Sequence, residues 1–247
     1  MRQVLGPASA DHLARFARSE VLLAFDFDGT LAPIVDDRSG ARMRARTREL
    51  LERASRAYPC AVISGRGRDD VEGRLDGVPV RYVVGNHGLE PSPDMARFER
   101  EIAAIRPEVE AALAGFPGVE VEDKRFSLSL HFRRARKKSD ALDAIRRALA
   151  PFGGAIRAVP GKAVVSVVPM QAPHKGDALL RLGAEAGAPN AIFVGDDLTD
   201  EDVFGLGRPE QLLSIRVGRS RSSAAGYYLR DQGEIDALLV RLLALRE

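Results

Sequence analysis

The sequence predicts a Rossmann-like, doubly wound α/β fold with a parallel sheet, and two observations carry this prediction. The first is a set of short apolar runs, each followed by a polar or glycine-rich cluster, at 21–25, 60–63, 81–84, 191–194 and 212–217. Because these runs are continuous rather than alternating, they are typical of strands covered on both faces. The second is the presence of helix-like stretches between them, at 41–57, 175–187 and 233–246. Strand and helix thus alternate as in a doubly wound sheet.

The segment from about 92 to 169 breaks this alternation. Its pattern predicts helix, two strands, helix and two strands, at 98–114, 119–123, 126–132, 138–150, 155–159 and 163–168. We interpret Pro160-Gly161 as the turn between the last two strands. The sequence therefore predicts an antiparallel αββαββ cap domain at 92–169, inserted into a core domain made of 1–91 and 170–247.

Composition excludes several classes of function. Hydrophobic residues make up 45% and charged residues 29% of the 247 residues, as in ordinary globular proteins. The net charge is only +2, from 37 Lys and Arg against 35 Asp and Glu, and no long basic run is present. Because nucleic-acid binding needs a basic surface, we expect no nucleic-acid partner.

The single cysteine and the N-terminal residues indicate where in the cell the protein is expected to be. Cys60 lies within an apolar run, so we expect a buried, reduced thiol and a cytoplasmic protein. The first 20 residues lack the apolar segment of a secretion signal, and no stretch reaches the ~20 apolar residues that span a bilayer. We expect no membrane partner, and a monomer.

Carboxylates follow two of the predicted strands. Asp26 and Asp28 follow 21–25 directly, and their spacing places both on one side of an extended backbone until Gly29 allows a turn. Without further motifs, two aspartates with this spacing most often belong to a solvated loop that has no function. Asp196 follows the strand at 191–194 in the same way. Because parallel strands end at the same sheet edge, three carboxylates converge there and favour Mg²⁺.

Two further residues suit a phosphate site. Ser64 ends the strand at 60–63, and Lys175 begins the helix at 175–187. Either residue alone is most often structural. The ordered set of DFDGT, strand-terminal Ser, helix-opening Lys and strand-terminal GDD resembles the four-motif pattern of the haloacid dehalogenase (HAD) superfamily. It runs through about 170 residues of the chain.

The HAD resemblance implies a mechanism. Asp26 is the implied nucleophile that forms a phosphoaspartate, and Asp28 the implied acid and base. Ser64 and Lys175 bind the phosphoryl oxygens. Mg²⁺ is held by Asp26, the Asp28 backbone carbonyl and Asp196. The carboxylates that then orient the waters of the metal are Asp197 and Asp200.

The position of the cap and a second set of motifs narrow the family. The motifs are SGR (64–66), GNHGLE (85–90), VEDKRFSLSLHFR (121–133), GKAVVSVVP (161–169), KG (175–176) and GDDLTDED (195–202). Together they resemble the trehalose-6-phosphate phosphatases, which implies a C2B-type cap, a phosphoric monoester hydrolase of trehalose biosynthesis, and a small-molecule sugar phosphate as partner. The implied substrate-binding residues are Arg66, His87, Glu122, Lys124, Arg133 and Lys162.

One departure keeps alternatives open. In this chain Ser166 occupies the position of the glutamate in the family's GKxVxE motif. This substitution removes an expected acceptor for a sugar hydroxyl. A phosphatase for another sugar phosphate, such as sucrose phosphate or a glycosylglycerate phosphate, is one alternative. A phosphomutase is disfavoured because its cap follows the first motif directly, where only some 36 residues separate Asp28 from Ser64. A non-catalytic sugar-phosphate-binding regulator typically loses one of the first two aspartates, and both are present.

Overall fold

The fold is described from a computed structural model, which describes residues 1–35, 38–161 and 163–246. The chain forms two compact units. Unit 1 comprises residues 1–89 and 173–247, and unit 2 comprises residues 90–172. Within the described residues, no helix is long and apolar enough to cross a membrane.

Unit 1 is built around a parallel sheet of seven strands in the order β1-β11-β10-β9-β2-β3-β4. The strand bounds are β1 Arg2–Gln3, β2 Val21–Phe25, β3 Cys60–Ile63, β4 Tyr82–Val84, β9 Asn190–Gly195, β10 Leu212–Val217 and β11 Tyr227–Leu229. β2 lies at the centre of the sheet, between β3 and β9. All five of its residues are buried, as the continuous apolar run predicts.

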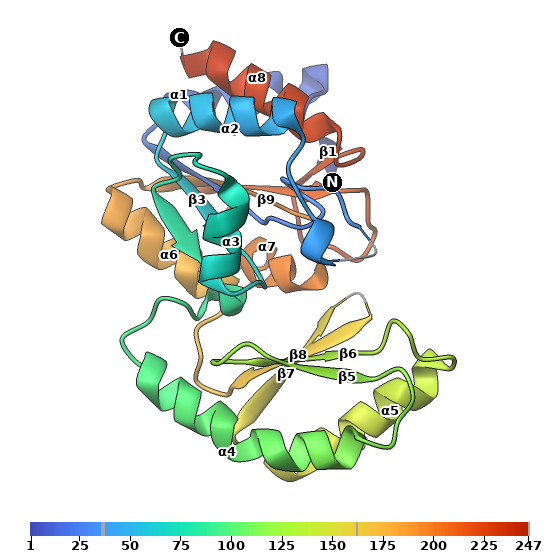
Figure 1. The fold of residues 1–247 in the computed structure, drawn as a ribbon. Helices are drawn as coiled ribbons and strands as arrows, with labels where there is room; N and C mark the ends of the chain where they lie inside the picture. Colours follow the sequence, from blue (N-terminus) through green and yellow to red (C-terminus); the bar gives the residue numbers. More distant parts are fainter. Residues whose placement is uncertain (36–37, 162, 247) are drawn as a thin grey trace. The chain divides into compact units, whose positions relative to one another are not determined.

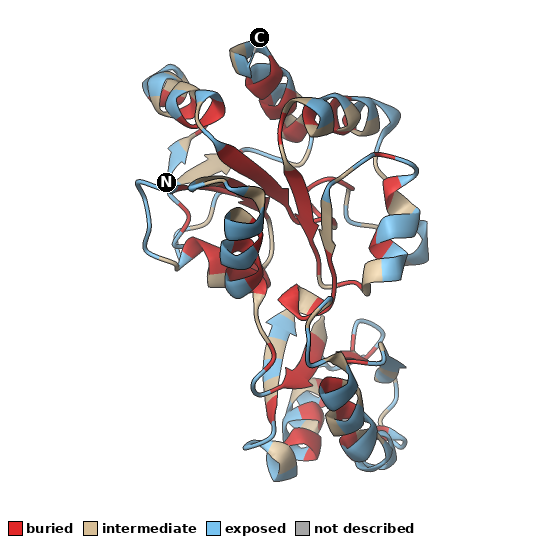
Figure 2. Cartoon of the chain, turned by 90° about the vertical axis from the view of Figure 1, so that its left-hand side faces the viewer, coloured by how far each residue is buried: buried red, intermediate tan, exposed pale blue. Residues whose placement is uncertain are grey.

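Helices cover both faces of this sheet (Figure 1). Their bounds are α1 Ala10–Arg18, α2 Ala45–Ala57, α3 Arg68–Leu75, α6 Lys175–Ala186, α7 Glu201–Phe204 and α8 Glu234–Arg246. One hydrophobic cluster joins α1, α2, α3 and α8 to the sheet, and another joins α6 and α7 to its other face. Figure 2 shows the central strands buried between these layers. The predicted doubly wound α/β fold is confirmed.

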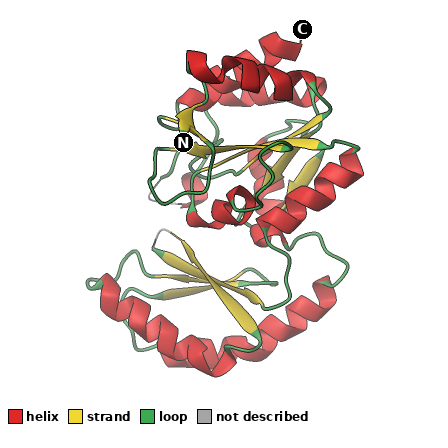
Figure 3. Ribbon diagram, turned by 180° about the vertical axis from the view of Figure 1, so that it is seen from behind, coloured by secondary structure: helices red, strands yellow, loops and turns green. Residues whose placement is uncertain are grey.

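Unit 2 has the predicted αββαββ order. Its main elements are α4 Met95–Leu113, β5 Glu120–Asp123, β6 Leu128–His131, α5 Lys138–Leu149, β7 Ile156–Gly161 and β8 Val164–Pro169. The strands form a separate antiparallel sheet in the order β5-β6-β8-β7. Figure 3 shows α4 and α5 along one face of this sheet.

The alternation of side chains along β6 and β8 decides which face of that sheet is the core. Leu128, Leu130, Val165 and Val167 pack with α4 and α5 in one hydrophobic cluster. Because successive side chains of a strand point to opposite faces, Ser129 and Ser166 lie on the other face. The two serines are also cross-strand partners.

The predicted turn at Pro160-Gly161 is wrong. Both residues belong to β7, where they pair with Val165 and Val164. β7 is an edge strand, so the missing N–H of Pro160 removes no hydrogen bond from the interior of the sheet. Ala163, which precedes β8, has a positive φ of 61°.

Candidate active site

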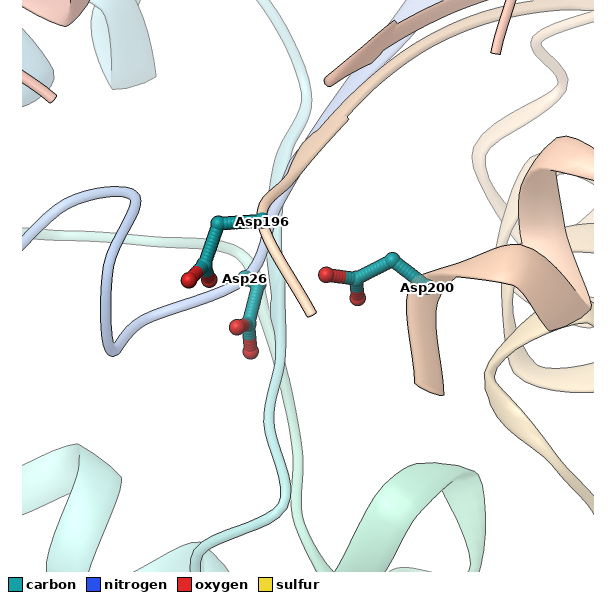
Figure 4. Close-up of side chains that lie close together, drawn as sticks. All are labelled: Asp26, Asp196 and Asp200. Carbon is teal, nitrogen blue, oxygen red and sulfur yellow. The ribbon is translucent and has the colours of Figure 1, made fainter. Parts of the chain in front are cut away.

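Three aspartates meet at the carboxyl end of the parallel sheet in unit 1. Asp26 follows β2 and Asp196 follows β9, and these two strands are paired side by side. Asp200 ends the short 3-10 helix η5, Leu198–Asp200. One carboxylate oxygen from each of the three lies within 4.8 Å of the others. Figure 4 shows the carboxylates of Asp26 and Asp196 side by side, with that of Asp200 turned toward them from the opposite side.

Lys175 joins two of these aspartates. Its Nζ lies 3.0 Å from Asp26 Oδ1 and 2.7 Å from Asp200 Oδ1, and the side chain is only 1% exposed. Lys175 is the first residue of α6, where a reciprocal pair of hydrogen bonds between His174 and Asp177 fixes the helix start. The predicted lysine therefore stands in direct contact with the predicted nucleophile.

Burial and charge act in opposite directions on these groups. Burial raises the pKa of Asp26 well above its usual range, Lys175 opposes that shift, and Asp200, Asp196 and Asp28 add to it. Burial also raises the pKa of Asp196 from 3.8 to about 7, with Asp200 and Asp197 adding to the shift. For Lys175 burial lowers the pKa, but Asp200 and Asp26 outweigh it and the net shift is upward. The site therefore holds more carboxylate charge than Lys175 compensates.

This surplus charge predicts how pH changes the stability of the metal-free protein. A carboxyl whose pKa is raised by folding stabilises the fold fully below its unfolded pKa, and that contribution is lost as pH rises through the folded pKa. For Asp196 the loss falls between about pH 4 and pH 7. We expect Asp196→Asn, whose side chain never ionises, to unfold at a higher temperature than wild type at pH 8.

The two melting temperatures are expected to converge as the pH is lowered towards 4. Thermal unfolding of both proteins in EDTA, followed by circular dichroism across this range, measures the difference. A difference that stays constant with pH would show that Asp196 does not titrate in the folded protein.

Two glycines permit the close approach of these carboxylates. A Cβ added at Gly29 would collide with the Asp196 carboxylate, and Gly29 has a positive φ of 80°. A Cβ added at Gly195 would collide with the Asp200 carboxylate. Any side chain at either position would displace an aspartate of the cluster.

An arginine that the sequence analysis did not single out supports the loop after β9. Arg216, on β10, donates to the backbone carbonyls of Asp196 and Asp197 at 2.5 and 3.3 Å. It also donates to Glu201 at 3.1 Å. Asp200 Oδ2 accepts the backbone N–H of Asp197 at 2.9 Å from within the loop. The Asp197 and Asp200 positions are thus fixed by main-chain contacts.

The donor set fits a hard divalent cation. Carboxylate oxygens are the ligands that Mg²⁺ takes in proteins. Within the described residues, Asp196 Oδ1 is a buried oxygen without a hydrogen-bond partner. A cation bound between Asp26 and Asp196 would satisfy this oxygen and would oppose the rise in both pKa values that burial and the neighbouring carboxylates cause.

Asp28 faces a different partner. Arg66 Nε donates to Asp28 Oδ2 at 2.6 Å, and Arg66 Nη2 donates to Asp28 Oδ1 at 2.7 Å. Arg66 was predicted to bind substrate, and the structure places its guanidinium against the predicted acid and base. Ser64 is buried at the end of β3, and its Oγ accepts the Arg66 N–H at 3.2 Å.

The turn that carries His87 lies beside these residues. The 3-10 helix η3, Asn86–Gly88, follows β4, and both Asn86 and His87 have positive φ values, of 48° and 61°. The turn is tied to the SGR segment because His87 N–H donates to the Ser64 carbonyl and Asn86 N–H donates to the Arg66 carbonyl. A Cβ at Gly65 would meet the His87 ring. The structure thus brings Ser64, Arg66 and His87 together.

The predicted cap residues lie in unit 2. Glu122 is exposed on β5, and its Oε2 lies 2.7 Å from His131 Nε2 on β6. Lys124 follows β5 in a turn where its N–H donates to the Ser127 carbonyl at 2.9 Å. Arg133 is exposed, just after β6. Lys162 lies outside the described residues.

Ser166 occupies a position in register with these residues. Glu122 pairs with Ser129, and Ser129 pairs with Ser166 on β8. The residue that replaces the family's glutamate therefore lies in the same cross-strand row as Glu122.

The fold and the site together define a class. A parallel sheet whose central strand β2 is followed by Asp26, together with a lysine that begins a helix, an aspartate at the end of a neighbouring strand and a separate antiparallel unit, is the arrangement of the HAD superfamily. The trehalose-phosphatase family model matches residues 24–232, and the chain belongs to that family.

Individual relatives agree with this assignment. The chain is 37% identical over 212 residues to a trehalose-phosphate phosphatase of Mycobacterium avium, covering 78% of this chain and 53% of that protein. It is 30% identical to a probable trehalose-phosphate phosphatase of rice, Oryza sativa, covering 93% of this chain and 68% of the relative. The chain thus spans about half the length of the mycobacterial relative.

The fold has a close counterpart among solved structures. The C-terminal domain of the Candida albicans trehalose-6-phosphate phosphatase superposes with a TM-score of 0.83 at 22% identity, covering 99% of both chains. At that level of identity the likeness concerns the fold.

Proposed function

We propose that this chain is a Mg²⁺-dependent phosphatase that hydrolyses trehalose 6-phosphate to trehalose and phosphate through a phosphoaspartate on Asp26. The observation that carries the proposal is the buried contact between Lys175 and Asp26, beside Asp196, in a member of the trehalose-phosphatase family. The buried, reduced Cys60 supports a cytoplasmic setting.

The residues divide the reaction between them. Asp26 attacks the phosphorus atom, and Asp28 gives a proton to the departing sugar oxygen. In the second half, Asp28 takes a proton from the water that hydrolyses the phosphoaspartate. Lys175 and the hydroxyl of Ser64 hold the phosphoryl oxygens during both steps. Asp200 supports this role because it accepts a hydrogen bond from the Lys175 ammonium, which also contacts Asp26.

Mg²⁺ is proposed to be held by Asp26, the backbone carbonyl of Asp28 and Asp196, with Asp197 and Asp200 orienting its waters. When bound, it supplies positive charge against the nucleophile and the phosphoryl group. Lys175 and the cation would then share the charge of Asp26, so this carboxyl would be ionised despite its burial.

Release of inorganic phosphate from a panel of trehalose, sucrose and glucose 6-phosphates and a glycosylglycerate phosphate tests the substrate. We expect trehalose 6-phosphate to give the highest kcat/KM. Because Ser166 replaces a glutamate in the same cross-strand row as Glu122, we expect weaker discrimination among glucosyl-containing phosphates than that glutamate would give. A chain indifferent to trehalose 6-phosphate but active on another member of the panel would move the assignment to that sugar phosphate.

Glu122 and Lys124 provide the test of sugar recognition. If they bind sugar hydroxyls, Ala at either position should lower kcat/KM for trehalose 6-phosphate by roughly ten- to a hundredfold, because a charged hydrogen bond to substrate is lost. The same variants should lower kcat/KM for 4-nitrophenyl phosphate less than about twofold, because that substrate has no sugar. Steady-state phosphate release with both substrates measures the difference.

Glu120→Ala is the matched control for Glu122→Ala. Glu120 lies two residues earlier on β5, is exposed, and pairs with Arg134 at 2.9 Å. We expect Glu120→Ala to leave kcat/KM unchanged for both substrates. Equal losses on sugar and aryl phosphates in the Glu122 and Lys124 variants would instead assign the pair to the stability of unit 2.

A further inference from the structure

The peptide that joins Asp196 to Asp197 is held at both of its polar groups. Its carbonyl, which belongs to Asp196, accepts a hydrogen bond from Arg216 Nη2 at 2.5 Å. Its N–H, which belongs to Asp197, donates to Asp200 Oδ2 at 2.9 Å. Because a peptide is planar, these two bonds fix its orientation. The proposed metal ligand Asp196 therefore adjoins a peptide whose plane is set by two side chains.

Arg216 reaches this peptide from the neighbouring strand. It belongs to β10, where it pairs in register with Gly195, the last residue of β9. The Arg216 side chain is only 16% exposed. Its Nη1 donates to the next carbonyl along the loop, that of Asp197, at 3.3 Å. Because a guanidinium presents its donors in a rigid plane, one side chain restrains two successive peptides of the loop.

Glu201 holds Arg216 in turn. Glu201 is the first residue of α7, and its Oε1 accepts from Arg216 Nη1 at 3.1 Å. Its Oε2 accepts the backbone N–H of Ala224 at 2.8 Å, in the segment before β11. The charge of Arg216 is thus balanced by a carboxylate that has a second anchor of its own.

The Asp196 carboxylate depends on this backbone for its position. Within the described residues, Asp196 Oδ1 is buried without a hydrogen-bond partner. The carboxylate packs against Gly29, where a Cβ would collide with it. An oxygen without a hydrogen-bond partner is placed by the backbone that carries it, so a shift of the loop would move the oxygen. Mg²⁺ requires near-octahedral geometry with ligands at about 2.0–2.1 Å, and such a shift would weaken its binding.

We propose that Arg216 is a positioning residue of the metal site, which holds the carbonyls of Asp196 and Asp197 and thereby sets the affinity for Mg²⁺. The proposal rests on the proposed function, in which Asp196 is a metal ligand. Charge alone predicts the opposite effect, because Arg216 is a cation close to a cation site and its removal would strengthen Mg²⁺ binding. The sign of the change therefore separates positioning from charge.

Isothermal titration calorimetry of the metal-free protein with Mg²⁺ at pH 8 tests the proposal. For Arg216→Gln we expect the Kd for Mg²⁺ to rise about tenfold, as for loss of a group that supports a metal ligand. Arg216→Lys keeps the charge but has one donor nitrogen in place of the planar fork, so we expect a rise of about threefold. Circular dichroism in EDTA checks that both variants are folded.

Turnover provides a readout that a general structural defect would not give. In both variants the Mg²⁺ concentration for half-maximal activity should rise by the same factor as the Kd. At saturating Mg²⁺ their kcat should return to within about twofold of wild type, because Arg216 touches neither the substrate nor Asp26 in the proposed mechanism. A defect of folding would lower kcat at every Mg²⁺ concentration.

Two control variants accompany these. Arg221→Gln removes the same charge at an exposed position five residues later and should bind Mg²⁺ as wild type does. Arg216→Gln combined with Asp196→Ala should bind Mg²⁺ no more than about twofold more weakly than Asp196→Ala, because the ligand that Arg216 positions is already gone.

The outcomes separate the two proposals. A wild type that does not bind Mg²⁺ overturns the role of Arg216 together with the proposed metal dependence. A wild type that binds Mg²⁺ but hydrolyses no sugar phosphate overturns the proposed function, and the calorimetry of the variants still decides the role of Arg216.

A wild type that binds Mg²⁺ and is active, with an unchanged or lower Kd in Arg216→Gln, overturns the role of Arg216 alone. If Arg216→Gln does not fold, an unchanged or lower Kd in Arg216→Lys has the same meaning. The role of Arg216 is also overturned by a tenfold weakening in Arg221→Gln, or by the full effect of Arg216→Gln on the Asp196→Ala background.

Discussion

Replacement of Asp26 by asparagine is expected to lower kcat by at least about a thousandfold while the protein remains folded, because an amide of the same shape cannot form the phosphoaspartate. Lys175 keeps a partner in this variant, since Asp200 lies 2.7 Å from its Nζ. Burying the neutral amide also removes a carboxylate whose charge burial opposes. We therefore expect a melting temperature in EDTA equal to or above that of wild type.

Phosphate release from trehalose 6-phosphate and circular dichroism measure these two quantities on the same preparation. Asp202→Asn is the control for the same chemical change, because Asp202 lies close in sequence to Asp196 and Asp200 but is absent from the three-carboxylate cluster. It should retain activity. An Asp26→Asn protein that melts normally and keeps more than a few per cent of wild-type kcat would exclude the phosphoaspartate on this residue.

Removal of divalent metal is the second change with a large expected effect. Dialysis against EDTA should abolish turnover, and Mg²⁺ should restore it, because Lys175 alone leaves the carboxylates of the site undercompensated. Ca²⁺ should restore less activity, since its larger radius and looser coordination disturb the in-line geometry.

The residue that should set the metal requirement is Asp196. In Asp196→Ala the concentration of Mg²⁺ for half-maximal activity should rise by at least about tenfold, because one of the carboxylate ligands is lost. In Asp202→Asn it should stay unchanged. Isothermal titration calorimetry with Mg²⁺ measures the affinity of the three proteins for the metal without turnover, and we expect Asp196→Ala to bind it more weakly than wild type and Asp202→Asn. Full activity of the metal-free wild type would contradict the metal site.

The sequence was sufficient to predict the architecture because the hydrophobic pattern of the central strands is strong. The apolar runs at 21–25, 60–63 and 212–217 coincide with strands, and continuous apolarity is a property of strands buried on both faces. The two short strands at one side of the sheet gave no such signal. β1 and its neighbour β11 have two and three residues, of which only Leu229 is buried, and only pairing within the sheet defines them.

The candidate site was predictable where side chains follow strand ends. Asp26 and Asp196 could be placed together because β2 and β9 run parallel, although their order in the sheet is visible only in the structure. The partners of Arg66 were not predictable. Arg66 and Asp70 are four residues apart on a loop and a helix, but the approach of Asp28 depends on the packing of β2 beside β3.

Arg216 was missed for a similar reason. It lies within an apolar strand, where the single charge gave no indication of its contact with the loop after β9. A charged residue in an otherwise buried strand is the signal that could have found it, because such a group needs partners.

The order of the strands has a consequence for the protein during synthesis on the ribosome. β2 ends at Phe25, yet its neighbour β9 begins only at Asn190, so one edge of β2 stays unpaired until most of the chain has been made. Unit 2, by contrast, is a continuous segment, residues 90–172, with a hydrophobic cluster of its own. Because segments with a complete core fold as they emerge from the ribosome, we expect unit 2 to fold before unit 1 is complete. Until β9 has been synthesised, the first 89 residues lack partner strands and remain exposed to chaperones.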